Sequence, residues 1–163
     1  MATRSGSVDP GLLLWVQRHG AIDAEEMERA LDRESGLLAL SGRSGDMREI
    51  VAGIEEGDHR CRLAFDTYIH RLAAGIAAMT AAMGGIDALV FTGGVGENSA
   101  QVRAAAGTAS RFLGVEIDRA ANDANQRDRV ISSPKSAVPV LVLSAREDIE
   151  LAAQVRESLK VDA

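Results

Sequence analysis

The stretch FTGGVGENS, residues 91–99, places three glycines within four positions. An apolar run over 86–92 precedes it and predicts a strand that is buried on both faces. Apolar residues at helical spacing follow and predict a helix over 98–113. Glycines allow positive φ angles and close approach of a ligand, and the first N–H groups of a helix favour anions. A strand, a glycine loop and a helix in this order outline a phosphate-binding site.

Three kinds of glycine loop are compatible with parts of this stretch. A Walker A loop needs a lysine directly after its glycines, and none stands here, which argues against that interpretation. A Rossmann fingerprint, GxGxxG, matches at Gly94 and Gly96, but Ser99 occupies its third small position. Asp118 lies about 20 residues further on, where such folds bind a ribose hydroxyl, so this interpretation stays open. A purely structural turn is the third interpretation.

The remaining sequence predicts an α/β fold that is helix-rich and has few strands. The helices come first, after Asp9-Pro10, after Asp23, as a short turn within 37–48, over 49–57 and over 58–83. The later elements are short strands near 115–117 and 130–131, a helix over 119–128, a strand over 139–143 and a helix over 146–160. The shortage of strands indicates that sheet partners lie outside this chain.

Two helices carry apolar stripes that predict packing. Spacing along the long helix indicates core or dimer contacts for Cys61, Phe65, Tyr68, Ile69, Leu72, Ile76, Met79 and Met83. The last helix is expected to face inward through Ile149, Leu151, Ala152, Val155 and Leu159.

The composition argues against nucleic acid and membranes as partners. The formal net charge is −6 and aromatic residues make up 3% of the chain. Phosphate backbones need a basic surface, and stacked bases need aromatic side chains. No apolar run is long enough to span a bilayer. The single cysteine, Cys61, excludes an internal disulfide and a cysteine-rich zinc site, and we expect a cytoplasmic protein.

Four blocks of sequence, in order and spread over nearly the whole chain, resemble one family. They are MATRSGSVDPG at 1–11, SGLLALSGRSGDMREI at 35–50, ALVFTGGVGENSAQVR at 88–103 and VPVLVLSAREDIELA at 138–152. Together they resemble the C-terminal portion of the acetate kinases. That family belongs to the actin, sugar-kinase and chaperone ATPase superfamily, with two similar ribonuclease H-like α/β domains around a nucleotide. The resemblance therefore implies that residues 1–163 form a partial second, nucleotide-binding domain.

The resemblance also implies roles for individual residues. The implied nucleotide-binding residues are Asp46, Met47, Arg48, Gly93, Gly94, Val95, Gly96 and Glu97. Without the resemblance, Asp46 and Arg48 would be interpreted as a surface ion pair. Arg4 matches the catalytic arginine, and Glu147 matches the glutamate associated with Mg²⁺. The implied substrates are ATP or ADP with acetate or acetyl phosphate, and propionate or another short-chain acid is the alternative.

The residue types suit these roles. An arginine is always charged and binds planar anions with two parallel hydrogen bonds, as phosphoryl transfer to a carboxylate requires. Mg²⁺ is usually held by one or two carboxylates together with phosphates and waters. Two departures from the family pattern are Ser7 in place of an acid and Asp148 in place of a second glutamate.

The resemblance covers none of the family's first domain and none of its NxGSSSK or HLGNG motifs. It therefore implies that the chain begins within the second domain and is inactive by itself. Exposed apolar surface and the family's habit of dimerising predict self-association. A nucleotide-binding or dimerisation fragment without catalysis is the alternative to an active kinase.

Overall fold

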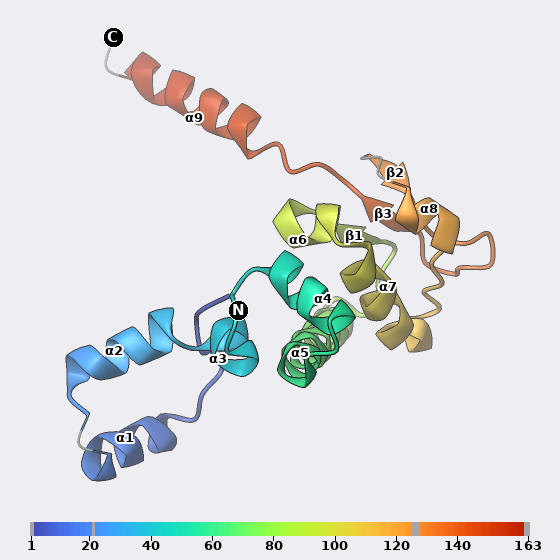
Figure 1. Cartoon of the computed structure of the whole chain (residues 1–163). Coiled ribbons are helices and arrows are strands. Elements are labelled where there is room, and N and C mark those ends of the chain that lie inside the picture. The colour runs from blue at the N-terminus through green and yellow to red at the C-terminus, as the bar shows by residue number, and fades with distance from the viewer. Residues whose placement is uncertain (1, 21, 125–127, 162–163) are drawn as a thin grey trace. The chain divides into compact units, whose positions relative to one another are not determined.

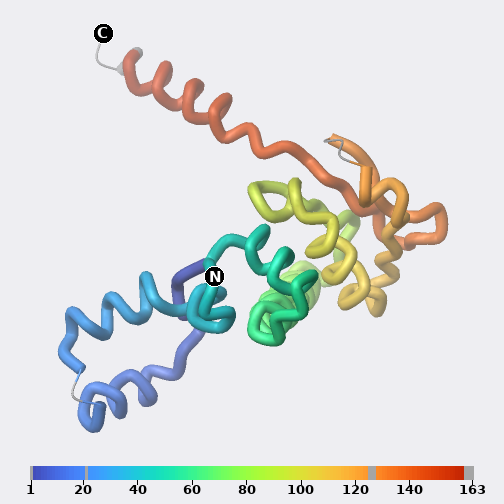
Figure 2. The backbone as a smooth tube through the Cα atoms, viewed as in Figure 1, coloured from blue at the N-terminus to red at the C-terminus, as the bar shows by residue number. Residues whose placement is uncertain are grey.

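The computed structural model describes residues 2–20, 22–124 and 128–161. The chain divides into two compact units, 1–82 and 83–163, and each is described by itself. Figure 1 labels the elements and Figure 2 traces the backbone from one end to the other. The expectation that both units belong to one domain stays a prediction. No helix in the described ranges is long and apolar enough to cross a bilayer.

The regular elements in the described part of the first unit are all helices. Its elements are α1 (Pro10–His19), α2 (Ala24–Arg33), α3 (Gly36–Ser41), α4 (Met47–Glu55) and α5 (His59–Met83). Aspartates accept hydrogen bonds from the first turn of α1, α2 and α4, as Asp9, Asp23 and Asp46 do. These caps satisfy N–H groups that have no partner within the helix, so the sequence fixes where the helices begin.

The core of the first unit gathers where α3, α4 and the start of α5 meet. Its buried side chains are Leu37, Met47, Ile50, Cys61, Ala64 and Phe65, with Met27 from α2. Gly53 packs so closely on Cys61 that a Cβ at position 53 would overlap Sγ. The rest of the α5 stripe is partly or fully exposed, and Met79 is 58% exposed. The stripe therefore contributes to this core only near its N-terminal end.

The second unit is built on a small mixed sheet. Its elements are β1 (Leu89–Phe91), α6 (Gly93–Asn98), α7 (Ala100–Ala109), a 3-10 turn η1 (Arg111–Leu113), α8 (Arg119–Asp123), β2 (Arg129–Val130), β3 (Val140–Val142) and α9 (Glu147–Val161). The strand order is β1-β3-β2. β1 runs parallel to β3, with Val90 opposite Leu141, and β2 runs antiparallel to β3. The α/β fold class, rich in helix and poor in strand, is confirmed.

Several strand and helix limits differ from the sequence-based expectation. The first strand covers three residues, and Val90 at its centre is 44% exposed, so burial on both faces was wrong. β1 has a described neighbour on one side alone, which leaves the other side and one face uncovered. Ile117 forms an isolated bridge to Ser132 instead of a strand. The helix expected over 119–128 ends at Asp123, and residues 125–127 lie outside the described part.

The expected inward stripe of the last helix is also wrong. The large apolar side chains of α9 are 56–69% exposed at Ile149, Leu151, Val155 and Leu159. None of the α9 side chains that the structure describes is buried. A helix gains most of its stability from packing an apolar face, and no described element of this unit covers that face.

Candidate nucleotide site

The glycine stretch is a short helix and not an open loop. β1 ends at Phe91, Thr92 is the N-cap residue, and α6 covers Gly93–Asn98. The chain then bends at Ser99, which has extended backbone and whose side chain accepts a hydrogen bond from the N–H of Val102. The single helix expected over 98–113 is therefore α7 followed by η1. The glycines form a separate helical turn before it, α6, which is called the glycine turn below.

Two of the three glycines have a physical reason within the fold, and these two reasons differ. Gly93 has φ +73°, a left-handed conformation that side chains with a Cβ rarely adopt. A Cβ at Gly96 would lie 3.3 Å from the carbonyl carbon of Phe91, so glycine there lets the turn pack on β1. At Gly94 neither reason holds, because its φ is not positive and a Cβ would have no atom within 4 Å apart from the adjoining backbone of its own helix. The space beside Gly94 is therefore open on the surface of the turn.

The carboxylate of Glu97 is engaged by the backbone. Its Oε1 accepts hydrogen bonds from the N–H of Gly93 at 2.9 Å and from the N–H of Ala145 at 2.8 Å. The first contact closes the glycine turn on itself, and the second connects it to the segment before α9. The N–H of Gly93, which the sequence suggested for a phosphate, is thus taken by a side chain of the same turn.

A buried arginine that the sequence analysis did not select holds the other end of this turn. Arg103 on α7 is 3% exposed. Its Nη1 donates to the carbonyls of Gly96 and Glu97 at 2.9 and 2.8 Å. Its Nε and Nη2 donate to the side-chain and backbone oxygens of Asn122, both at 2.8 Å. Burial lowers the pKa of Arg103 from its usual value, and nearby Arg129 adds to the effect.

Arg103 left a weak signal in the sequence. It falls between Val102 and Ala106, both buried, on the inward side of α7. A charged residue at a core position of a helix is rare unless its donors are satisfied. Its partner Asn122 is also buried, at 2% exposure, and donates to the carbonyl of Ala100. The spacing of nineteen residues between Arg103 and Asn122 gave no indication that the two would meet.

We expect Arg103→Met to destabilise the second unit by roughly 2–3 kcal/mol, because several buried oxygens would lose their donor. Arg103→Lys should recover only part of this, since an ammonium cannot bridge Asn122 and the α6 carbonyls together. The measurement is the free energy of unfolding by urea denaturation. Arg111→Met, at an exposed position of η1, is the matched control and should change it by under about 0.5 kcal/mol. Equal effects of the two methionine variants would contradict the bracing role.

The segment before α9 places Glu147, the predicted metal residue. The N–H of Leu143 donates to the carbonyl of Phe91 at 2.9 Å, extending the contact between β3 and β1. Glu147 is the first residue of α9 and is exposed. Among the described residues, no three His, Cys, Asp or Glu side chains gather closely enough to hold a metal ion. An exposed carboxylate still fits Mg²⁺ bound mainly through nucleotide phosphates and waters.

The predicted residues of the first unit have separate surroundings. Asp46 is the N-cap of α4 and accepts from the backbone N–H of Arg48 at 2.9 Å. Its carboxylate also pairs with the Arg48 side chain, which is 88% exposed, so the surface ion pair is present. Met47 is buried at 5% exposure, and its side chain belongs to the core. The nucleotide-binding roles of these three residues stay predictions.

Arg4 lies on an N-terminal stretch that is hydrogen-bonded to the helices. The N–H of Ser5 donates to the carbonyl of Leu31, and the carbonyl of Thr3 accepts from the N–H of Ser35. The side chain of Arg4 is 77% exposed, with Nε 3.7 Å from a carboxylate oxygen of Asp32. An exposed arginine on a fixed backbone can reach an anionic ligand, and its catalytic role stays a prediction.

The stretch after Arg4 borders a cavity of about 550 Å³, which Ser5, Gly6 and Ser7 line. Ser7, which replaces an acid of the family pattern, accepts a hydrogen bond from Arg71 at 2.7 Å. One wall of the cavity is therefore polar and includes the positively charged side chain of Arg71.

Arg48 holds the pKa of Asp46 at about 2, below its usual range, mainly through the hydrogen bond between the two side chains. Folding therefore favours the ionised carboxylate. This contribution to stability is present above the ordinary carboxyl pKa and is lost as the pH falls towards about 2. An NMR titration of the Asp46 carboxyl carbon should give this midpoint, and Arg48→Gln should raise it. An unchanged midpoint in Arg48→Gln would show that the pair does not form in solution.

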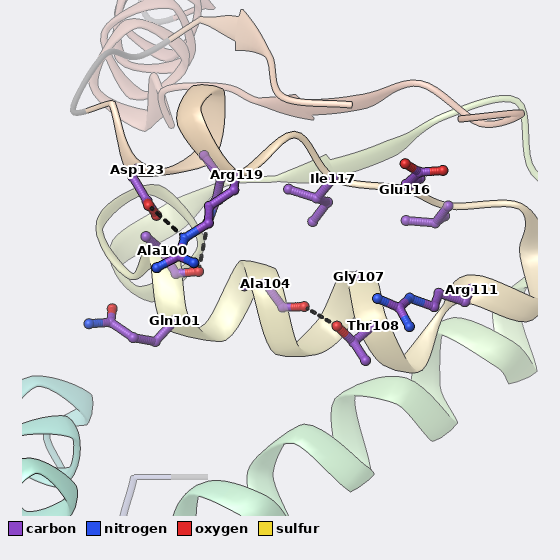
Figure 3. Close-up of a pocket in the computed structure, with 12 residues that line it drawn as sticks. Ala100, Gln101, Ala104, Gly107, Thr108, Arg111, Glu116, Ile117, Arg119 and Asp123 are labelled. Atoms are coloured by element: carbon purple, nitrogen blue, oxygen red, sulfur yellow. Dashed lines mark hydrogen bonds and ion pairs between the residues drawn. The ribbon is translucent and has the colours of Figure 1, made fainter. Parts of the chain in front are cut away.

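A second cavity, of about 710 Å³, lies along the exposed face of α7. Figure 3 shows its lining, with Ala104 and Thr108 on the helix and Glu116 and Ile117 on the facing segment. None of Gly93–Glu97 lines it. It is therefore separate from the glycine turn.

The Rossmann interpretation of the glycine stretch is wrong. Asp118, the candidate ribose ligand, is the N-cap of α8 and accepts from the N–H of Ala121 at 2.7 Å. Ser99, at the third small position, caps α7. Asp118 therefore does not end a strand that lies beside β1, as the ribose ligand of a dinucleotide fold would.

Comparison with known proteins assigns the family. The model of the acetokinase family matches residues 1–153. The acetate kinase of Gloeobacter violaceus is 46% identical over 160 residues, which cover 98% of this chain and 40% of that protein. The acetate kinase of Nostoc punctiforme matches with the same identity and coverage. The chain thus spans about 40% of the length of the curated relatives it matches.

Solved structures agree with the family match. The chain is similar to the crystal structure of Porphyromonas gingivalis acetate kinase, with a TM-score of 0.89, 39% identity and coverage of 98% of this chain and 40% of that one. It is also similar to a propionate kinase from Francisella tularensis, with a TM-score of 0.83, 33% identity and coverage of 90% and 37%. The fold is therefore that of part of an acetate or propionate kinase. By sequence and fold together, the chain belongs to the acetokinase family.

Proposed function

We propose that this chain is the nucleotide-binding portion of a kinase that transfers the γ-phosphoryl group of ATP reversibly to acetate. The family membership supports the reaction class, and this chain covers about 40% of the length of its relatives. In-line transfer requires both substrates to be held at once. We therefore expect this chain by itself to bind nucleotide without turnover.

The open surface at Gly94 is the observation that carries this proposal. Gly93 and Gly96 are explained by backbone conformation and by packing on β1, but Gly94 has neither constraint. A glycine in a helix costs up to about 1 kcal/mol relative to alanine, so an unneeded one is unfavourable for stability. A nucleotide lying against α6 supplies the missing reason, because any side chain at position 94 would occupy its place.

The remaining roles follow from the chemistry of each group. Gly93–Glu97 form the turn against which the nucleotide lies, and Asp46, Met47 and Arg48 border the adenosine. Arg4 binds the oxygens that carry negative charge as a carboxylate oxygen bonds to the γ-phosphorus and the bridge to ADP breaks. Glu147 contributes a carboxylate to Mg²⁺, which when bound would neutralise charge on the phosphates.

A short-chain acyl kinase for propionate is the second candidate. The similarity to the Francisella tularensis propionate kinase, with a TM-score of 0.83, favours it. The glycine turn and Arg4 serve either acid equally. The groups that they recognise, the phosphates and the carboxylate, are the same with both acids. The choice of acid depends on how an apolar pocket accommodates one more methylene, which is worth only about 1–3 kcal/mol.

Calorimetric titration of Mg-ADP into the purified chain tests the proposal. We expect saturable binding at one site. Gly94→Ala should raise the Kd about tenfold or more, because the new methyl group meets the nucleotide, and Gly94→Leu should abolish binding. Both variants should keep or slightly raise the melting temperature, since alanine and leucine favour a helix more than glycine does.

Gly96→Val is the matched control for a packing effect. Its side chain would meet the carbonyl carbon of Phe91, so it should lower the free energy of unfolding by about 1–3 kcal/mol. If Gly94→Leu binds Mg-ADP with the affinity of the unsubstituted chain, the nucleotide does not lie against α6. Self-association without any binding heat in the unsubstituted chain would instead favour a dimerisation piece.

We also propose that the chain self-associates in the cytoplasm as a homodimer. Large apolar side chains are exposed on α5 and α9, with Leu63 at 56% and Leu159 at 69%. Light scattering at micromolar concentration should report a mass above 17.2 kDa. A monomer over the same range would contradict this.

A further inference from the structure

A single carboxylate oxygen joins two segments that lie far apart in the sequence. Oε1 of Glu97 accepts from Gly93, the first residue of α6, at 2.9 Å. The same atom accepts from Ala145, 48 residues away, at 2.8 Å. The contact with Gly93 is partly buried, and the contact with Ala145 is exposed. The glycine turn and the segment that leads into α9 are thus connected through one atom.

The segment 143–146 is held at each of its positions. Besides the contact of Leu143 with β1, the N–H of Ser144 donates to Asp128 at 2.9 Å, and the guanidinium of Arg146 donates to the other carboxylate oxygen of Asp128 at 2.6 Å. Of these contacts, that of Glu97 alone reaches α6. Because no described side chain of α9 is buried, the segment 143–146 is what positions the first residue of α9, Glu147.

We propose that Glu97 is a positioning residue, which holds the glycine turn and the metal-associated Glu147 in register through its two backbone contacts. The inference rests on the proposed function, since it takes α6 as the nucleotide surface and Glu147 as the metal residue. Glu97 does not itself bind nucleotide or metal. Its carboxylate accepts hydrogen bonds from two backbone N–H groups and so connects two parts of the site.

The identity of the acceptor atom makes the proposal testable. Both contacts use Oε1, so a glutamine carbonyl can replace it, whereas alanine removes the acceptor and aspartate is one methylene too short. In Glu97→Ala the amides of Gly93 and Ala145 should exchange with deuterium at least about tenfold faster, and in Glu97→Gln they should stay protected. The measurement is residue-resolved hydrogen exchange by NMR, without nucleotide.

Asp128→Ala is the matched control for a loosened segment. It removes the acceptor of Ser144, so the amide of Ser144 should exchange faster while that of Gly93 stays protected. The second readout is calorimetry with ADP, with and without Mg²⁺. Glu97→Ala should raise the Kd of Mg-ADP by about tenfold, and Glu97→Gln should recover most of that loss.

Each outcome decides a separate question. Fast exchange restricted to one of the two amides, or no change in Glu97→Ala, would overturn the tie. In Glu97→Gln, the amides of Gly93 and Ala145 could stay protected while Mg-ADP binds as poorly as in Glu97→Ala. That result would show that Glu97 contacts the nucleotide or the metal directly, and the proposal would be wrong. If the unsubstituted chain binds no Mg-ADP, the proposed function fails, and the amide pattern still decides whether Glu97 joins the two segments.

Discussion

The guanidinium of Arg103 is buried among backbone carbonyls, and the conformation of the glycine turn depends on it. A six-residue helix has too few internal hydrogen bonds to be stable by itself, and α6 contains three glycines in addition. The turn is fixed from outside at both ends. At the start of the turn, Glu97 accepts a hydrogen bond from the N–H of Gly93. At the end of the turn, Arg103 donates to the carbonyls of Gly96 and Glu97. Rigidity that glycine cannot supply comes from two charged side chains.

This arrangement lets one surface of the turn stay bare. A ligand surface made of backbone must be both accessible and rigid, and these demands conflict in a glycine-rich loop. Arg103 braces the turn from its buried side, towards Asn122, and Glu97 joins the turn to the segment before α9. A Cβ at Gly94 would have no atom within 4 Å apart from the adjoining backbone of its own helix. The packing of Gly96 on β1 places the turn directly at the carboxyl end of the strand. Ligands of open α/β sheets commonly bind at that end.

The arginine also connects parts of the second unit that would otherwise be joined weakly. Its contacts with Asn122 attach α8 to α7, and Asn122 in turn donates to the start of α7. Buried polar groups with every partner in place favour one arrangement over its competitors, because any slip leaves a charge without acceptors. The small sheet of three short strands could not impose this order by itself, since its described hydrogen bonds involve only a few residues.

Local sequence determined much of this protein: the helix starts at Asp9 and Asp23, the strand before the glycines, the α/β class and, through four motif blocks, the family. These signals come from neighbouring residues, so they can be read without knowing the fold. Only the tertiary structure decided that the glycine stretch is a helix, that Gly94 is the one of its three glycines without a constraint, and that Arg103 and Glu97 brace the turn. Those facts depend on atoms such as Asn122 and the N–H of Ala145, which are brought close by packing. The exposed face of α9 was misjudged for the same reason: a helical apolar stripe shows that a face can be buried, but only the surrounding structure determines whether anything covers it.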